Sequence, residues 1–160
     1  MVNEISREEL INQLEQKASA YEFRGRNCCQ ATLLALQEQF NLGNGSVLKA
    51  ATAFPGIAAR GDTCGAVVGA LLALGLVYGR DDIEDMEGFT TALRTARRFC
   101  RRFEEEFGSL MCRDVQKVVV GRTYNLIDPA EEAEFERAGG YEKCGLPPAK
   151  AVRIVAEMIM

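Results

Sequence analysis

The chain has 160 residues and a net charge of −4, which is the size of one domain with room for its own core. The negative charge argues against a general nucleic-acid binder, and the longest uncharged apolar run is shorter than the ~20 residues that span a bilayer. The start, Met1 to Glu4, carries neither a basic nor an apolar signal segment, so we expect a cytoplasmic protein. Histidine is absent, which removes the commonest general base and a common zinc ligand. Six cysteines favour redox or metal chemistry in that compartment.

The first half of the chain predicts four helices, each preceded by a short polar side chain that can cap it. Their ranges are about 7–25, 28–40, 47–54 and 64–78, with Ser6, Asn27, Ser46 and either Asp62 or Thr63 as caps. The fourth helix contains no charged residue, and a helix that is apolar all round is a buried one. Gly65, Gly69 and Ala73 lie on one face of it, where small side chains let another helix approach closely. We therefore expect this to be the central helix, with Cys64 in its first turn.

The second half predicts four more helices, at about 88–107, from Ser109, at about 129–138 and from Pro147. The run Val118–Val120 favours a short extended piece, which alone cannot make a sheet. The arginines within Arg94–Arg102 lie mostly off the apolar stripe of the long helix; they form either an anion site or, more commonly, a solvated face. The sequence thus predicts an all-α fold over 1–160, a single compact bundle of about six to eight helices around the central helix at 64–78. A peripheral N-terminal helix occupies 1–24.

Four cysteine positions share a place at or near a predicted helix start. Cys28 with Cys29, Cys64 and Cys112 fall in first turns, and Cys144 lies just before the final helix. Unpaired N–H groups and the helix dipole make such positions locally positive, which favours the thiolate. If these helix ends converge, they form an electropositive thiol pocket for dithiol–disulfide exchange or for ligating a metal or an iron–sulfur cluster. Neighbouring side chains on a helix point about 100° apart, so at most one of Cys28 and Cys29 belongs to the pocket.

The same residues resemble a known family. The pattern consists of Asn27-Cys28, the run Cys64–Gly69, the segment 103–109 before Cys112, and a late, lone Cys144. It resembles the C_GCAxxG_C_C family of putative redox-active proteins over about residues 25–160. The resemblance implies redox activity and selects Cys28, Cys64, Cys112 and Cys144 as the four family cysteines. It leaves Cys29 and Cys100 as extras, and Cys100 also falls in the apolar stripe of the helix at 88–107, which favours core packing.

Three functions remain as alternatives. The first is a cytoplasmic redox protein in which Cys64 is the leading thiolate, Cys28, Cys112 or Cys144 completes a disulfide, and the redox partner is unknown. The second is an electron-transfer or sensor protein whose same four cysteines bind an iron–sulfur cluster or another thiophilic metal. In the third, the cysteines are inert core residues of a helical interaction module that could pair as a homodimer through its apolar faces. Whether the protein is an enzyme stays open, although a cysteine hydrolase would lack its usual histidine base.

Overall fold

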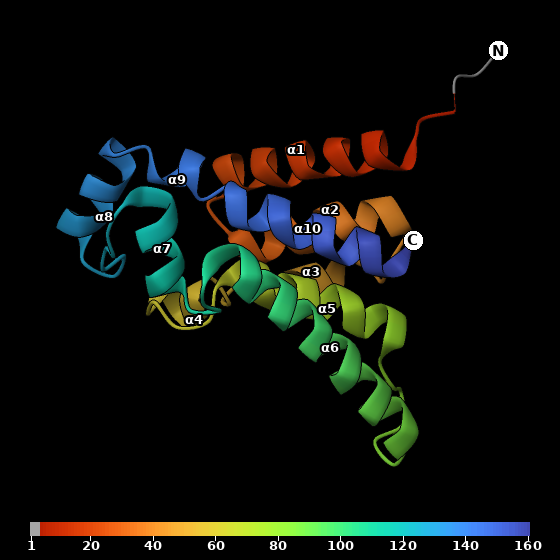
Figure 1. Cartoon of the computed structure of the whole chain (residues 1–160). Helices are drawn as coiled ribbons and strands as arrows, with labels where there is room; N and C mark the ends of the chain where they lie inside the picture. The colour runs from red at the N-terminus through yellow and green to blue at the C-terminus, as the bar shows by residue number, and fades with distance from the viewer. Residues whose placement is uncertain (1–3) are drawn as a thin grey trace.

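The computed structural model describes residues 4–160 and is built from α-helices. In chain order they are α1 Arg7–Gly25, α2 Cys28–Phe40, α3 Gly45–Ala50, α4 Gly56–Ala59, α5 Gly65–Tyr78, α6 Met86–Phe107, α7 Cys112–Val120, α8 Pro129–Arg137, α9 Gly140–Lys143 and α10 Leu146–Ile159 (Figure 1). The all-α prediction is confirmed. The count exceeds the expected one because α4 and α9 have four residues each, too few to show a hydrophobic period. No helix within residues 4–160 is both long enough and apolar enough to cross a membrane.

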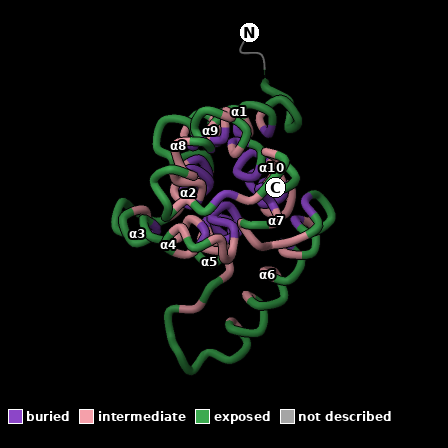
Figure 2. The backbone as a smooth tube through the Cα atoms, turned by 90° about the vertical axis from the view of Figure 1, so that its left-hand side faces the viewer, coloured by how far each residue is buried: buried purple, intermediate pink, exposed green. Residues whose placement is uncertain are grey.

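The core lies where α2, α5 and α10 meet, and the buried parts of the chain gather there (Figure 2). Helix α10 packs against α1, α2, α5 and α6, and α2 packs against α1 and α5. The fully buried side chains at these contacts include Leu36, Val67, Phe99, Phe103 and Val152. Burial of this apolar surface is the main stabilising contribution to such a bundle. It also holds the starts of α2 and α5 together at one end of the molecule.

The predicted small-residue face of α5 is the surface that packs against α2. A Cβ atom added to Gly69 would lie 2.4 Å from the carbonyl oxygen of Cys29, and one added to Gly65 would lie 2.4 Å from the sulfur of Cys28. Real Cβ atoms do not approach other atoms so closely, so only glycine fits at these two positions. The close approach of α5 and α2 therefore depends on the glycines in the sequence of α5.

The prediction that α5 is buried all round is wrong at its C-terminal end. Leu76 and Val77 are exposed, whereas the residues of the first two turns are mostly buried. The reason is the path of the next segment, because the loop after Tyr78 and the start of α6 extend away from the bundle (Figure 2). Other elements therefore pack against only one side of the last turn of α5.

The remaining local differences have simple causes. Helix α3 begins earlier than expected because the Oδ1 atom of Asn44, and not the hydroxyl of Ser46, caps it. Val118–Val120 is the last turn of α7, because a short β-branched run follows whichever element packing favours. The arginines of α6 form a solvated face: four of the five are exposed, and Arg102 pairs with Glu157 of α10.

Candidate thiol site

Cys28 and Cys64 are brought into contact by the close packing of α2 on α5. Cys28 is the first residue of α2, whose Asn27 cap accepts a hydrogen bond from the Gln30 N–H at 2.9 Å. Cys64 immediately precedes α5. The Cys28 thiol lies against Cys64 and Gly65: both act on its pKa, and a Cβ atom added to Gly65 would lie 2.4 Å from the Cys28 sulfur. Of the predicted cysteines, these two form the directly contacting pair.

The residue that caps α5 differs from the prediction. Cys64 itself occupies the N-cap position, without a side-chain hydrogen bond to the helix, in place of Asp62 or Thr63. The carboxylate of Asp62 is used elsewhere, in a 2.8 Å ion pair with Arg113. Cys64 is therefore at the helix start, as expected, but one position before the first turn.

Cys112 is held beside Cys64 by paired backbone segments. Thr63 and Met111 form an isolated antiparallel bridge, the Cys64 N–H donates to the Leu110 carbonyl at 2.8 Å, and the Cys112 N–H donates to the Asp62 carbonyl at 2.6 Å. Because these bonds involve only backbone atoms, side-chain patterns do not reveal them. They fix the start of α7 against the start of α5.

Cys112 lies earlier in its helix than predicted. Met111 is the N-cap of α7 and Cys112 is its first residue, whereas the sequence suggested Ser109 as the cap. The hydroxyl of Ser109 instead accepts from the Met111 N–H at 3.0 Å and donates to Asp114 at 2.8 Å. This arrangement orders the turn that precedes the helix, and Cys112 remains at the helix start.

A cavity of about 150 Å³, the thiol cavity, lies at this end of the bundle. Its lining consists of Glu22, Arg26, Cys28, Pro55, Gly56, Ala59, Cys112, Gln116, Leu126, Phe135, Tyr141 and Cys144. Three of the four predicted cysteines therefore share one cavity, and the fourth, Cys64, lies outside its lining, next to Cys28, and is only 4% exposed. Cys29 is fully buried in the core and Cys100 packs half-buried against it, as expected for the extra cysteines.

The wall of the thiol cavity formed by α4 has an unusual backbone. All four residues of Gly56–Ala59 have positive φ angles, between 51° and 61°. For residues other than glycine this left-handed conformation costs roughly 1–2 kcal/mol each, and a β-branched residue such as Ile57 is a strong outlier. Backbone hydrogen bonds hold the turn, including Ala59 N–H to the Pro55 carbonyl at 2.8 Å. The turn places Gly56 against Cys112, since a Cβ added there would lie 3.5 Å from the Cys112 sulfur.

Glu22 of α1 is the residue of the thiol cavity that the sequence analysis did not select. Its side chain is buried, its Oε2 atom has no hydrogen-bond partner, and burial raises its pKa to about 8. A signal was present in the sequence. Leu14, Ala18 and Glu22 are spaced by four, so a carboxylate stands on the apolar stripe of an amphipathic helix. A charge there is expensive to bury, and such a position is a candidate for chemistry.

Burial contributes to the raised pKa values of all three thiols that line this cavity. The hydrogen bond with Cys64, followed by burial, raises the pKa of Cys28 well above its ordinary value. Burial raises the pKa of Cys112, although a hydrogen bond from Gln116 at 3.4 Å opposes it. Burial and then the charge of Glu22 raise the pKa of Cys144. The raised pKa values of these three thiols therefore oppose the thiolate form that helix starts were expected to favour, in a cavity whose lining combines apolar residues with Glu22 and Arg26.

The arrangement does not fit a metal centre. Within residues 4–160, no three cysteine, aspartate or glutamate side chains are placed so that they could hold one metal ion. An iron–sulfur cluster or a thiophilic metal needs three or four such ligands around one point. Cys28, Cys64, Cys112 and Cys144 share one end of the fold, but they do not surround a common centre.

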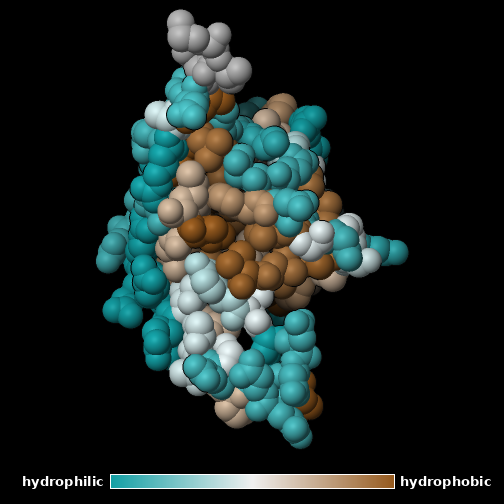
Figure 3. All heavy atoms as spheres, turned by 90° about the vertical axis from the view of Figure 1, so that its right-hand side faces the viewer, coloured by the Kyte–Doolittle hydropathy of each residue, from teal (hydrophilic) through white to brown (hydrophobic). Residues whose placement is uncertain are grey.

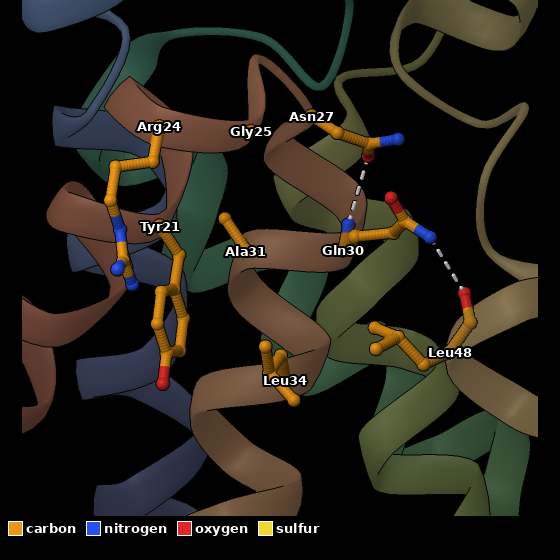
Figure 4. A pocket seen from close by; sticks show the side chains of 8 residues that line it. All are labelled: Tyr21, Arg24, Gly25, Asn27, Gln30, Ala31, Leu34 and Leu48. Atoms are coloured by element: carbon orange, nitrogen blue, oxygen red, sulfur yellow. Dashed lines mark hydrogen bonds between the residues drawn. The ribbon is translucent and has the colours of Figure 1, made fainter. Parts of the chain in front are cut away.

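A larger hollow of about 330 Å³ lies on another side of α2, between the end of α1 and α3 (Figure 4). Its lining contains no cysteine. Within it the Gln30 amide donates to the Leu48 carbonyl at 2.9 Å, the Tyr21 hydroxyl donates to Glu38 at 2.9 Å, and the Arg24 guanidinium lies over the Tyr21 ring, 5.1 Å from its centre. This hollow therefore offers no thiol for the chemistry that the cysteines of the other cavity suggest.

The fold and the cavity define an all-α protein with a cluster of thiols at one end of its bundle. The chain belongs to the C_GCAxxG_C_C family, whose model, described as "Putative redox-active protein (C_GCAxxG_C_C)", matches residues 26–158. A search of curated proteins and a search of solved structures each gave no match. The matched range includes Cys28, Cys64, Cys112 and Cys144 but not Glu22, which lies on α1.

Proposed function

We propose that this protein is a thiol redox protein in which Cys28 and Cys64 form a reversible disulfide. The observation that carries the proposal is the proximity of the two thiols: Cys64 acts directly on the Cys28 thiol, and Gly65, the residue after Cys64, packs against the Cys28 sulfur. Disulfide formation needs two sulfurs that can approach to bonding distance without large backbone movement. Membership of a family of redox-active proteins supports the same conclusion, and a reducing cytoplasm would return such a pair to the thiol state.

Exposure decides the order in which the two thiols act. Cys28 lines the thiol cavity and is partly exposed, whereas Cys64 is only 4% exposed and is not part of the lining. A disulfide that enters the cavity therefore meets the sulfur of Cys28 first. This proposal gives Cys28 the leading role that the sequence suggested for Cys64, and it makes Cys64 the resolving thiol.

The reaction is a thiol–disulfide exchange in two displacements. The Cys28 thiolate attacks one sulfur of the partner disulfide, so a mixed disulfide forms and the first partner thiolate leaves. Cys64 then loses its proton and attacks the Cys28 sulfur, which forms the internal disulfide and releases the second thiolate. One disulfide bond is made and one is broken, the two protein thiols are oxidised, and their two protons go with the two partner thiols.

Peptide mapping of the oxidised protein tests this proposal. Fully reduced protein is treated without oxygen with bis(2-hydroxyethyl) disulfide, alkylated and analysed by mass spectrometry. The expected product is a Cys28–Cys64 disulfide. It should persist in Cys100→Ser, because Cys100 lies outside the cavity, and disappear in Cys64→Ser, which should stop at the mixed disulfide on Cys28. A product in which Cys28 and Cys64 both remain free thiols would overturn the proposal.

A further inference from the structure

Glu22 is a buried carboxyl group that no structural contact explains. Its residue is 4% exposed, and its Oε2 atom is buried without a hydrogen-bond partner. A buried charge without a partner costs several kcal/mol, and an uncharged side chain of similar size would avoid that cost. A strained or unsatisfied group of this kind inside a cavity is a candidate for chemistry.

The groups around Glu22 in the thiol cavity leave it free. Arg26 is the one cation among the described lining residues, and its guanidinium lies 2.6 Å from Glu136 and stacks over the Tyr141 ring at 4.5 Å. The Tyr141 hydroxyl donates to Glu132 at 2.6 Å. The Gln116 amide is engaged on both sides, since it donates to Cys112 and accepts from the Tyr124 N–H at 2.7 Å.

The remaining polar groups that face Glu22 across the cavity are thiols. Cys28, Cys112 and Cys144 all line it with Glu22, and the charge of Glu22 acts on each of the three. Of these, Cys28 is the thiol that the proposed function requires to become a thiolate. A cysteine nucleophile is ordinarily activated by an adjacent base, and this chain contains no histidine.

We propose that Glu22 is the proton acceptor that activates Cys28, an inference that rests on the proposed function. The Glu22 carboxylate takes the proton from the Cys28 thiol as its sulfur attacks the partner disulfide, and the neutral carboxyl then passes that proton to the partner thiolate that leaves. The carboxyl group ends as it began, so the exchange stays balanced. The raised pKa of about 8 places Glu22 close to the pH range where a general base is most effective.

The pH dependence of oxidation provides the test. The rate of Cys28–Cys64 disulfide formation with bis(2-hydroxyethyl) disulfide is measured between about pH 6 and 9.5. In the native protein the rate should rise through an inflection near pH 8, because only the ionised carboxylate accepts a proton. In Glu22→Gln the rate above pH 8 should fall by roughly tenfold or more, and the inflection near pH 8 should be lost.

Two variants make the result specific. Glu9→Gln removes an exposed carboxylate from the same helix and should keep the native profile, whereas Glu22→Asp keeps the carboxyl group and should recover part of the rate. If Glu22→Gln forms the Cys28–Cys64 disulfide at the native rate and with the native pH profile, the role of Glu22 is overturned while the proposed function stands. If no protein in the series forms that disulfide, the proposed function itself fails.

Discussion

The two ends of α5 have similar apolar compositions and opposite environments. At its start, Gly65 and Gly69 lie so close to α2 that an added Cβ would overlap with Cys28 or Cys29, and Cys64 is buried. At its end, a Cβ added to Gly75 would meet nothing within 4 Å, and Leu76 is 38% exposed. The difference shows that apolar composition alone does not decide burial. Burial follows the small residues that admit a neighbouring helix.

The exposed apolar surface at the C-terminal end of α5 continues onto the start of α6. Val77 of α5 and Phe89 and Leu93 of α6 are also partly exposed, and apolar residues show on the face of the molecule that this end belongs to (Figure 3). At the start of α5, beside the thiol cavity, the same kind of surface is covered by α2, and Cys64 is only 4% exposed.

The largest expected effect comes from the ionisation of Glu22, which lines the thiol cavity at the start of α5. Burial raises the pKa of Glu22 from 4.5 to about 8, so the folded protein keeps a proton that the unfolded chain releases. The associated stability is fully present below pH 4.5, decreases as the pH rises and is lost above pH 8. Relative to Glu22→Gln, the native free energy of unfolding should fall by up to roughly 5 kcal/mol across that range. Urea denaturation at a series of pH values measures it.

Glu87→Gln is the matched control for this titration. Glu87 is exposed at the start of α6, at the end opposite the thiol cavity, so its carboxylate is in water in both the folded and the unfolded protein. Its stability curve should run parallel to the native curve. If the stability curve of Glu22→Gln also runs parallel to the native curve, then burial does not keep the Glu22 carboxyl neutral. The end with the thiol cavity and the opposite end would then show no electrostatic contrast.

Adding one methyl group to each end of α5 gives the next largest effect. In Gly69→Ala the new Cβ would lie 2.4 Å from the Cys29 carbonyl oxygen, and because that atom is backbone, α2 and α5 must separate. Overpacking of this kind costs about 1–3 kcal/mol. Gly75→Ala meets no neighbour and should stabilise the protein by about 0.5–1 kcal/mol, because alanine loses less entropy in a helix. Thermal and urea unfolding should give shifts of opposite sign, and equal shifts would contradict the packing contrast.

The same contrast explains what could be predicted from the sequence. Periodicity and caps located the long helices, and the place of Cys28, Cys64 and Cys112 at or next to helix starts was visible from local signals. Gly65 and Gly69 indicated a close helix contact, although not which helix makes it. That α2 is the partner, and hence that Cys28 meets Cys64, depends on long-range packing that one chain segment does not encode.

Two parts of the site were beyond local prediction for different reasons. The left-handed turn at Gly56–Ala59 has no turn signal after its glycine, since Ile57 and the following alanines ordinarily avoid positive φ. Tertiary contacts impose it. Glu22 was visible as a charge on an apolar stripe, but such a residue can also reach water at a helix edge, and only the position of the cavity separates the two outcomes.

The smallest expected difference tests burial alone, with one substitution made at both ends of α5. Val67 is 1% exposed and Val77 is 37% exposed. Val67→Ala removes two buried methyl groups and leaves a gap in the core, so we expect a loss of roughly 2 kcal/mol in the free energy of unfolding. Val77→Ala removes surface that water already reaches and gains helix propensity, so its effect should lie within about 0.5 kcal/mol of zero.

If Val77→Ala lowers the free energy of unfolding as much as Val67→Ala does, the end of α5 is covered in solution, by a second copy of the chain or another partner. In that case the loss at Val77 should shrink when the protein is diluted below the dissociation constant of that contact.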